Sequence, residues 1–225
     1  MDLAVVQLGV VPYEEALELQ LRLRELRQAD EIGDTLLLLE HPPVHTRGRR
    51  TEVHDLPMGE DWYRMQGIEI HDADRGGRVT YHGPGQLVGY PIMRIGDVPE
   101  FVRTMERAVA AALADEGIEA GCRDGLTGIW AGEAKIGSIG VHVSRGVTTH
   151  GFAVNVDNDL QPFEWVVPCG LDGVRMTSVT KETGHGDGIS CFRKRMAYRF
   201  AQAFGMRQRI TSLERLEAAP VASIA

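Results

Sequence analysis

Two neighbouring runs of strand-forming residues constrain the fold more than any other feature of the chain. Lys135 to Ser144 and Val147 to Val156 are rich in valine, and only Arg145-Gly146 separates them. Two such runs around a two-residue turn that contains glycine predict an antiparallel hairpin. We therefore expect the centre of the chain to supply paired strands of an antiparallel sheet.

A glycine-dense stretch runs from Arg75 to Gly89 and reads Arg-Gly-Gly-Arg-Val-Thr-Tyr-His-Gly-Pro-Gly-Gln-Leu-Val-Gly. Val79 to Tyr81 and Gln86 to Ile92 predict strands, and the glycines and proline between them indicate a turn. The glycine spacing matches neither a P-loop nor a dinucleotide-binding motif. Two interpretations stay open. One is a tight hairpin, and the other is a wall whose glycines let a ligand approach the bare backbone.

The remaining periodicity predicts both strands and helices. The predicted strands are Val5 to Leu8, Thr35 to Leu39, Ile68 to His71, Ile118 to Cys122 and Thr127 to Ala131, and the main predicted helices are Tyr13 to Ala29, Pro99 to about Ala114 and Ser190 to about Phe204. The strands cluster as hairpins and do not alternate strictly with helices. We therefore predict an α+β fold: one domain over residues 1–225, with a core at about 5–204 and a mixed, mostly antiparallel sheet flanked by helices.

Composition narrows the class of protein. The chain has 225 residues, 43% of them hydrophobic, and a formal net charge of -8. This size supports one sizeable core, and the acidic balance argues against a nucleic-acid partner. No apolar run is long enough to predict a membrane span. The three cysteines lie far apart, so a disulfide or zinc framework is not expected and a cytoplasmic location fits.

Cys169 is the candidate nucleophile. Most free cysteines are buried packing residues, but Pro168 and Gly170 bracket this one in a predicted loop. A sulfur in a loop can be exposed, and the N–H of Gly170 could stabilise a developing oxyanion. By contrast, Cys122 at a strand end and Cys191 in the first turn of a helix are better interpreted as packing residues.

Lys135 is the candidate electrostatic partner of that thiol. A free thiol titrates near ~8.5, and a nearby cation lowers its pKa. Lys135 is the only lysine before Lys181, and apolar neighbours would partly desolvate its ammonium. Once the thiolate is acylated the ammonium loses its partner, and the lysine could then accept a proton from an attacking amine. The alternative is a lysine at a strand edge that points into water.

Histidines offer weaker signals. His82 could act as a base, but a hydrogen-bonding structural role is favoured. His41 and His45 are separated by a segment with two prolines, which excludes a metal pair on one helix. No metal site is predicted.

Four motifs, taken together and in order, resemble the octanoyltransferase family, the lipoyl(octanoyl) transferases also called lipoate-protein ligase B. They are Arg75 to Gln86, Ala134 to Gly140, His150 to Asn155, and Pro168 to Leu171 followed by Thr177-Ser178. The resemblance extends from about Val5 to Phe204. It implies the catalytic-domain fold shared with biotin and lipoate ligases.

The resemblance also implies a reaction. Octanoyl would move from octanoyl-acyl carrier protein to Cys169, and then to a lysine of a lipoyl domain, in the first step of protein lipoylation. The acceptors would be the lipoyl domains of 2-oxoacid dehydrogenase E2 subunits and the glycine cleavage H protein. Transfer from a thioester to an amide is downhill, so no nucleotide or other cofactor is expected.

Carried over residue by residue, the resemblance makes Cys169 the acyl-accepting nucleophile and Lys135 the residue that tunes it. The substrate site would comprise Arg75, Gly76, Gly77, Arg78, Val79, Thr80, Tyr81, His82, Ser138, Ile139, Gly140, Gly151, Phe152 and Ala153. His45 and Arg47 depart from the pattern expected of the family. An eight-carbon chain buried at ~0.8 kcal/mol per methylene would be selected by length, although neighbouring lengths would differ by only about 1–3 kcal/mol.

Carrier proteins are acidic, so this acidic chain needs a local positive patch to bind one. Two arginine-rich clusters could supply it: Arg47, Arg49 and Arg50, or Arg193, Lys194 and Arg195.

One alternative function is an ATP-dependent lipoate or biotin ligase of the same fold, in which Cys169 is incidental. Another is a non-catalytic acyl-binding protein.

Overall fold

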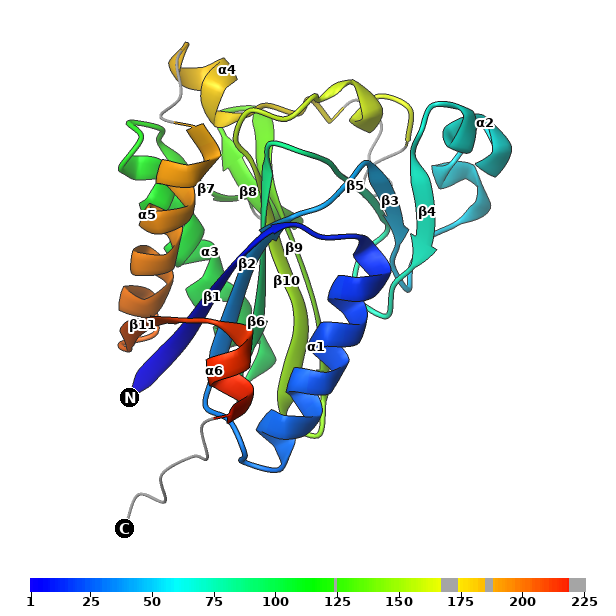
Figure 1. The fold of residues 1–225 in the computed structure, drawn as a ribbon. Helices are drawn as coiled ribbons and strands as arrows, with labels where there is room; N and C mark the ends of the chain where they lie inside the picture. Colours follow the sequence, from blue (N-terminus) through cyan, green and yellow to red (C-terminus); the bar gives the residue numbers. More distant parts are fainter. Residues whose placement is uncertain (124, 167–173, 185–187, 219–225) are drawn as a thin grey trace.

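The computed structural model describes residues 1–123, 125–166, 174–184 and 188–218 (Figure 1). Its centre is an eight-stranded sheet in the order β11-β1-β2-β6-β10-β9-β8-β7. The strands are β1 (Asp2–Val10), β2 (Thr35–Glu40), β6 (Gln86–Ile92), β7 (Ala120–Arg123), β8 (Leu126–Ala131), β9 (Ala134–Ser144), β10 (Val147–Asn155) and β11 (Arg207–Thr211). β1 is parallel to both of its neighbours, and every other pairing in this sheet is antiparallel. The predicted mixed, mostly antiparallel α+β fold is confirmed.

Helices cover both faces of this sheet (Figure 1). α1 (Tyr13–Gln28) and α6 (Leu213–Ala218) pack on one face, and α3 (Val98–Ala114) and α5 (Gly188–Ala203) pack on the other. Coverage on both sides explains the continuous apolar run in β2. Leu36 and Leu38 enter the core under α3 and α5, while Leu37 and Leu39 enter the core under α1.

The predicted hairpin between β9 and β10 is present. Val147 pairs with Ser144, and the two turn residues Arg145 and Gly146 have φ values of 46° and 75°. Positive φ at both positions is typical of a type I′ turn, whose twist matches that of the flanking strands. This hairpin forms the centre of the functional site described below.

The interpretation of the glycine-dense stretch as a tight hairpin is wrong. β5 (Val79–His82) does not pair with β6 but belongs to a separate three-stranded sheet with β3 (Val44–Arg47) and β4 (Glu69–Asp72). The chain therefore passes from one sheet to the other at residues 83–85. Gly83 permits this passage because a Cβ there would lie 2.2 Å from the Tyr81 hydroxyl. Thr46 and Arg47 lie in β3.

The smaller elements are short helices outside the two sheets. They are η1 (Val53–Asp55), α2 (Glu60–Met65), η2 (Gln161–Phe163) and α4 (Val179–Thr183). β11 and α6, which follow the last predicted helix, were not predicted from the sequence. β11 is a short edge strand with two arginines, and α6 buries only Leu216, so neither carries a strong apolar pattern. In the part of the chain that the structure describes, no helix combines the length and apolar character needed to span a bilayer.

Gly89 gives a test of how tightly the sheet packs against its helices. A Cβ at this position would lie 2.1 Å from Cζ of Phe152, its partner on β10. We expect Gly89→Ala to displace the Phe152 ring and lower the free energy of unfolding by roughly 1–3 kcal/mol, measured by urea denaturation. Gly121→Ala on β7 is the matched control, because a Cβ there meets nothing within 4 Å. Equal losses in the two variants would contradict this account.

Candidate active site

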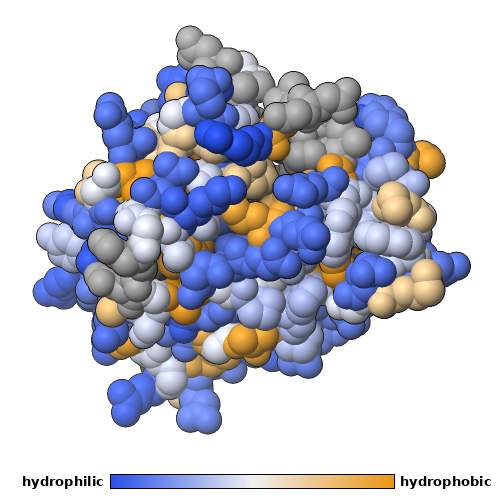
Figure 2. Space-filling model, turned by 90° about the horizontal axis from the view of Figure 1, so that it is seen from above, coloured by the Kyte–Doolittle hydropathy of each residue, from blue (hydrophilic) through white to orange (hydrophobic). Residues whose placement is uncertain are grey.

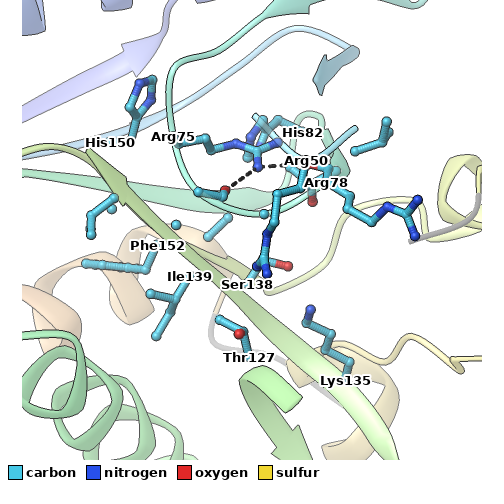
Figure 3. Close-up of a pocket in the computed structure, with 18 of the residues that line it drawn as sticks. Arg50, Arg75, Arg78, His82, Thr127, Lys135, Ser138, Ile139, His150 and Phe152 are labelled. Carbon is cyan, nitrogen blue, oxygen red and sulfur yellow. Dashed lines mark hydrogen bonds between the residues drawn. The ribbon is translucent and has the colours of Figure 1, made fainter. Parts of the chain in front are cut away.

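A cavity of about 650 Å³ lies where β9 extends beyond β8. β8 pairs with β9 only between Ala134 and Gly137, whereas β9 continues to Ser144. The glycine-dense stretch covers part of the edge that is left, and the N–H of Gly76 donates to the carbonyl of Val141 at 3.2 Å. Residues of β8, β9, β10 and the glycine-dense stretch line the cavity (Figure 3).

Thirteen of the fourteen predicted substrate residues line this cavity: Arg75, Gly76, Gly77, Arg78, Val79, Thr80, His82, Ser138, Ile139, Gly140, Gly151, Phe152 and Ala153. Tyr81 does not, because its ring packs against Phe163 with 5.4 Å between ring centroids. Glycine is needed where the two walls meet. A Cβ on Gly140 would lie 3.0 Å from the carbonyl oxygen of Gly76 and 3.3 Å from the side chain of Arg75.

Arg75 fixes the shape of the glycine-dense wall. Its side chain is buried, and Nη1 donates to the carbonyls of Gly76 and Arg78 at 3.0 and 2.9 Å. Nη2 donates to the carbonyl and the hydroxyl of Thr46 on β3 at 2.8 and 2.6 Å. Figure 3 shows the guanidinium beside the loop that it binds. One side chain therefore joins the wall to itself and to the second sheet.

Lys135 reaches the cavity from β9 (Figure 3). Its side chain is buried, and Nζ lies 5.9 Å from the centre of the Trp130 ring. The alternative in which this lysine points into water is wrong. Gly128 makes room for it, because a Cβ there would lie 2.5 Å from Cε of Lys135.

The backbone of Lys135 is tied to a segment that comes much later in the chain. Its N–H donates to the carbonyl of Arg175 at 2.8 Å, and its carbonyl accepts from the N–H of Thr177 at 2.9 Å. Val174, which directly precedes Arg175, lines the cavity. Cys169 itself lies outside the described residues.

His82 makes the hydrogen-bonding contacts that we favoured over a role as a base. Its Nδ1 lies 2.7 Å from Oε1 of Gln86, and burial holds the pKa of His82 well below its usual value. Nε2 of Gln86 donates to Oδ1 of Asn155, whose Nδ2 donates to the carbonyl of Thr177. These amides connect the cavity wall to the segment beside Lys135.

Several residues that line the cavity were not predicted from the sequence, notably Tyr13, Tyr90, Trp130 and His150. His150 is the most unusual, because it is buried in the middle of β10 with a φ of 57°. Its Nε2 lies 2.6 Å from Oδ1 of Asp74, and this contact lowers the pKa of that carboxyl group. Positive φ in a non-glycine strand residue is costly and often marks a functional site. Its position at the start of a motif was the one available signal.

Ion pairs neutralise most of the two arginine clusters that we considered as positive patches. Arg47 contacts Glu60 and Asp72 at 2.6 and 2.7 Å. Arg193 pairs with Glu40, and Arg195 pairs with Glu116. Arg49 and Arg50 remain exposed beside the cavity, with Arg49 3.0 Å from Nδ1 of His142 and Arg50 on the cavity lining.

The prediction that Cys122 and Cys191 are packing residues is wrong, because both are exposed. Cys122 lies on the edge strand β7, where pairing leaves one side open. Desolvation and the neighbouring Glu106 raise the pKa of the Cys122 thiol to about 11. This thiol therefore stays protonated near neutral pH and is a poor nucleophile.

No cluster of three or more metal-binding side chains occurs among residues 1–123, 125–166, 174–184 and 188–218. The cavity is instead lined by glycines, aromatic and aliphatic side chains, and a few cations. Such a lining suits a flexible, mostly apolar group held near a buried positive charge.

Comparison with known proteins identifies the family. The lipoyl protein ligase A/B catalytic domain matches residues 12–201. The chain belongs to the lipoyl protein ligase A/B family. An octanoyltransferase of Caldicellulosiruptor saccharolyticus is 44% identical over 224 residues, which cover 96% of this chain and 95% of that protein. The predicted family and the acyltransferase class are therefore confirmed.

Solved structures show the same fold. A bi-partite lipoate protein ligase from Thermoplasma acidophilum superposes with a TM-score of 0.74 at 20% identity, covering 96% of this chain and 89% of that one. A biotin protein ligase from Aquifex aeolicus gives a TM-score of 0.52 at 13% identity, covering 91% of this chain and 69% of that one. The predicted likeness to the biotin and lipoate ligase catalytic domain is confirmed.

The buried histidines predict how stability depends on pH. His41 and His45 are fully buried, and burial lowers the pKa of each to about 4. Because the unfolded chain takes up these protons near pH ~6.5, the free energy of unfolding should fall as pH drops from about 6.5 to 4. The slope is at most about 1.4 kcal/mol per pH unit for each histidine.

His45→Leu tests this directly. His45 packs between the rings of Tyr63 and Tyr81, at centroid distances of 5.1 and 5.4 Å. Leucine keeps an apolar side chain there but cannot titrate, so the variant should lose less stability on acidification. His54→Leu is the control, because His54 is exposed. Urea denaturation at a series of pH values gives the slopes, and a wild-type slope in His45→Leu would be evidence against the assignment.

Proposed function

We propose that this chain transfers an octanoyl group from octanoyl-acyl carrier protein to Cys169, and then to a lysine of a lipoyl domain. The observation that carries the proposal is the position of Lys135, a buried cation in a mostly uncharged cavity. The backbone of Lys135 is hydrogen-bonded to Arg175 and Thr177, which follow Cys169 by a few residues in the chain. The choice of octanoyl as the transferred group rests on the relatives that are named octanoyltransferase.

Chain connectivity supports a nucleophile at this cavity. Cys169 follows Val166 by three positions and precedes Val174 by five. Val166 is buried, and Val174 lines the cavity. The described segment that follows Cys169 in the chain thus reaches the cavity at Val174 and bonds to Lys135 at Arg175 and Thr177, which supports the proposal.

In the first half-reaction the Cys169 thiolate, stabilised by the Lys135 ammonium, attacks the carbonyl carbon of the octanoyl thioester. The oxyanion accepts a hydrogen bond from the N–H of Gly170. A new carbon–sulfur bond forms, and the bond to the carrier sulfur breaks. The carrier leaves as a thiol after taking a proton from Lys135, so the acyl-enzyme is paired with a neutral lysine.

In the second half-reaction the amine of the acceptor lysine attacks the same carbonyl carbon. Lys135 accepts a proton from that amine, the bond to Cys169 breaks, and an amide forms. The departing thiolate and the regenerated Lys135 ammonium restore the starting pair. The thioester supplies the driving force, so the cycle needs no nucleotide.

The test is to mix the protein with octanoyl-acyl carrier protein in the absence of ATP and to measure its intact mass. The proposal expects an adduct of one octanoyl group in place of one hydrogen, which disappears in Cys169→Ala. A requirement for ATP would instead support a ligase. Binding without a covalent adduct would support the non-catalytic alternative.

Replacing Lys135 tests its role as the partner of the thiol. In a background of Cys122→Ser and Cys191→Ser, Cys169 is the remaining thiol. We expect Lys135→Met to raise the pKa of Cys169 toward ~8.5 and to slow octanoyl transfer by about 100-fold or more. The pH dependence of alkylation by iodoacetamide reports the pKa.

Lys181→Met is the matched control, because Lys181 is exposed on α4. It should leave the titration of Cys169 unchanged. A wild-type titration curve in Lys135→Met would remove Lys135 from the proposed role.

Arg49 and Arg50 are the proposed docking site for the acidic carrier protein. Both are exposed, and Arg50 lines the cavity, in a chain with a net charge of -8. Seen from above, apolar side chains lie in a hollow between hydrophilic ones (Figure 2). A basic rim on an acidic protein can orient an acidic partner and raise its association rate.

Charge reversal tests this docking site. We expect Arg49→Glu combined with Arg50→Glu to raise the KM for octanoyl-acyl carrier protein several-fold at low salt, with a smaller effect at high salt. The loss should exceed that measured with a small-molecule octanoyl thioester. Arg209→Glu on the distant edge strand β11 is the control. Equal losses with both donors would argue against docking at this rim.

A further inference from the structure

Tyr13 presents a buried hydroxyl group that the proposed chemistry does not use. It is the first residue of α1, its side chain is 2% exposed, and it lines the cavity. Within the part of the chain that the structure describes, its hydroxyl oxygen has no hydrogen-bond partner. Buried polar groups are nearly always hydrogen-bonded, because an unpaired one is costly. The cavity must therefore supply a partner to this hydroxyl.

The other polar side chains around Tyr13 are already engaged. The Tyr90 hydroxyl lies 2.7 Å from Nε2 of His41, and the Tyr90 ring meets the ring of His150 at a centroid distance of 6.3 Å. His150 is bonded to Asp74, and Arg75 donates to its own loop and to β3. Among these four cavity-lining side chains, Tyr13 is thus the one whose polar atom has no partner in the described part of the chain. Burial raises the pKa of Tyr13 to about 12, so the group is a neutral phenol near pH 7.

The position of this end relative to Lys135 matters for an acyl chain. Figure 3 shows Lys135 and His150 at opposite ends of the site, with Ser138, Ile139 and Phe152 between them. The Lys135 side chain points toward Ser138 (Figure 3), so the path from its ammonium is counted from Ser138. His150 pairs with Val141, three residues along β9 from Ser138, and this distance is about 10 Å at the usual strand rise. The seven carbons beyond the octanoyl carbonyl extend to roughly 9 Å when fully stretched. The two lengths match.

We propose that Tyr13 sets the upper limit of the acyl chain length. This inference rests on the proposed function, because it takes the reacting carbonyl to lie near Lys135. An octanoyl chain would end just before the Tyr13 hydroxyl and leave a water molecule bound there. A longer chain would have to displace that water and place methylene groups against an unpaired hydroxyl.

The consequence is an asymmetric selectivity. On the short side, each missing methylene loses only a modest amount of apolar burial, so discrimination stays gradual. On the long side, the cost of stripping the hydroxyl is added, so rejection is sharper. An apolar end wall of the same size would lack this second contribution.

Tyr13→Phe separates the two contributions. It removes the hydroxyl, keeps the ring, and breaks no hydrogen bond to the described protein. The protein is mixed with equal amounts of hexanoyl-, octanoyl- and decanoyl-acyl carrier protein, and the three acyl adducts are measured by intact mass. The ratio of decanoyl to octanoyl adduct should rise roughly fivefold or more, while the ratio of hexanoyl to octanoyl adduct should stay at the wild-type value.

Tyr63→Phe is the matched control. It also removes a buried tyrosine hydroxyl, which donates to the carbonyl of Trp165, but Tyr63 does not line the cavity. Its adduct ratios should equal those of the wild type. Tyr13→Ala is a second variant that opens space and should extend acceptance to dodecanoyl.

The outcomes are distinguishable. If the wild-type protein forms no adduct with any donor, the proposed function fails and this inference fails with it. If the octanoyl adduct forms but both Tyr13 variants keep the wild-type ratio of decanoyl to octanoyl, the length limit is overturned while the proposed function stands. A wild-type ratio in Tyr63→Phe together with a raised ratio in both Tyr13 variants supports the inference.

Discussion

The site depends on the hydrogen bonds that the buried guanidinium of Arg75 donates. Removing a cation from water is expensive unless hydrogen bonds replace its hydration. Arg75 meets this requirement with acceptors from Gly76, Arg78 and Thr46. Those bonds fix the shape of a glycine-dense segment, which has little intrinsic shape of its own, and join it to β3, while the N–H of Gly76 joins it to Val141 on β9. Without them the cavity would lack one wall, because Gly76 and Gly77 carry no side chains to pack.

A second principle of the site is the separation of roles along β9 and β10. One end of the cavity carries Lys135 and the backbone contacts to the segment after Cys169. Ser138, Ile139 and Phe152 line the middle, and none of them is charged. The far end is aromatic and polar. Because one hairpin carries Lys135, these middle residues and His150, their spacing is set by the strand rise and not by flexible loops.

Local patterns in the sequence predicted local structure well. The hairpin around Arg145-Gly146 and the apolar strand β2 follow from turn chemistry and continuous hydrophobicity, both of which act over a few residues. Pairing between distant segments was harder. The strands on either side of Gly83 look like a hairpin, yet they join different sheets, because a turn signal shows where the chain bends and not which strand becomes its neighbour.

The same limit applies to the candidate site. The glycine-dense stretch and Lys135 carry recognisable motifs, so their lining of a shared cavity could be anticipated. Tyr13 and His150 were not assigned, because the first begins a helix far from the motifs and the second starts a motif but gives no sign of its positive φ or of its contact with Asp74. That both line one cavity depends on the packing of α1 against β10, which no local pattern encodes. The prediction that Cys122 and Cys191 are packing residues was wrong for a related reason, since residue type alone does not determine which side of an element faces solvent.

The position of β1 has a consequence for how the chain acquires its structure during synthesis. β1 lies between β2 and β11, and Asp2 contacts Arg207 across a separation of 205 residues. Because synthesis starts from the N-terminus, β1 therefore gains its second neighbour only after the 205 residues that separate Asp2 from Arg207 have been made. Until then one of its edges has unsatisfied amide groups, which chaperones or other nascent chains could bind. Completion of the sheet, and with it the final docking of α5 and α6, is for this reason a late event in the maturation of the protein.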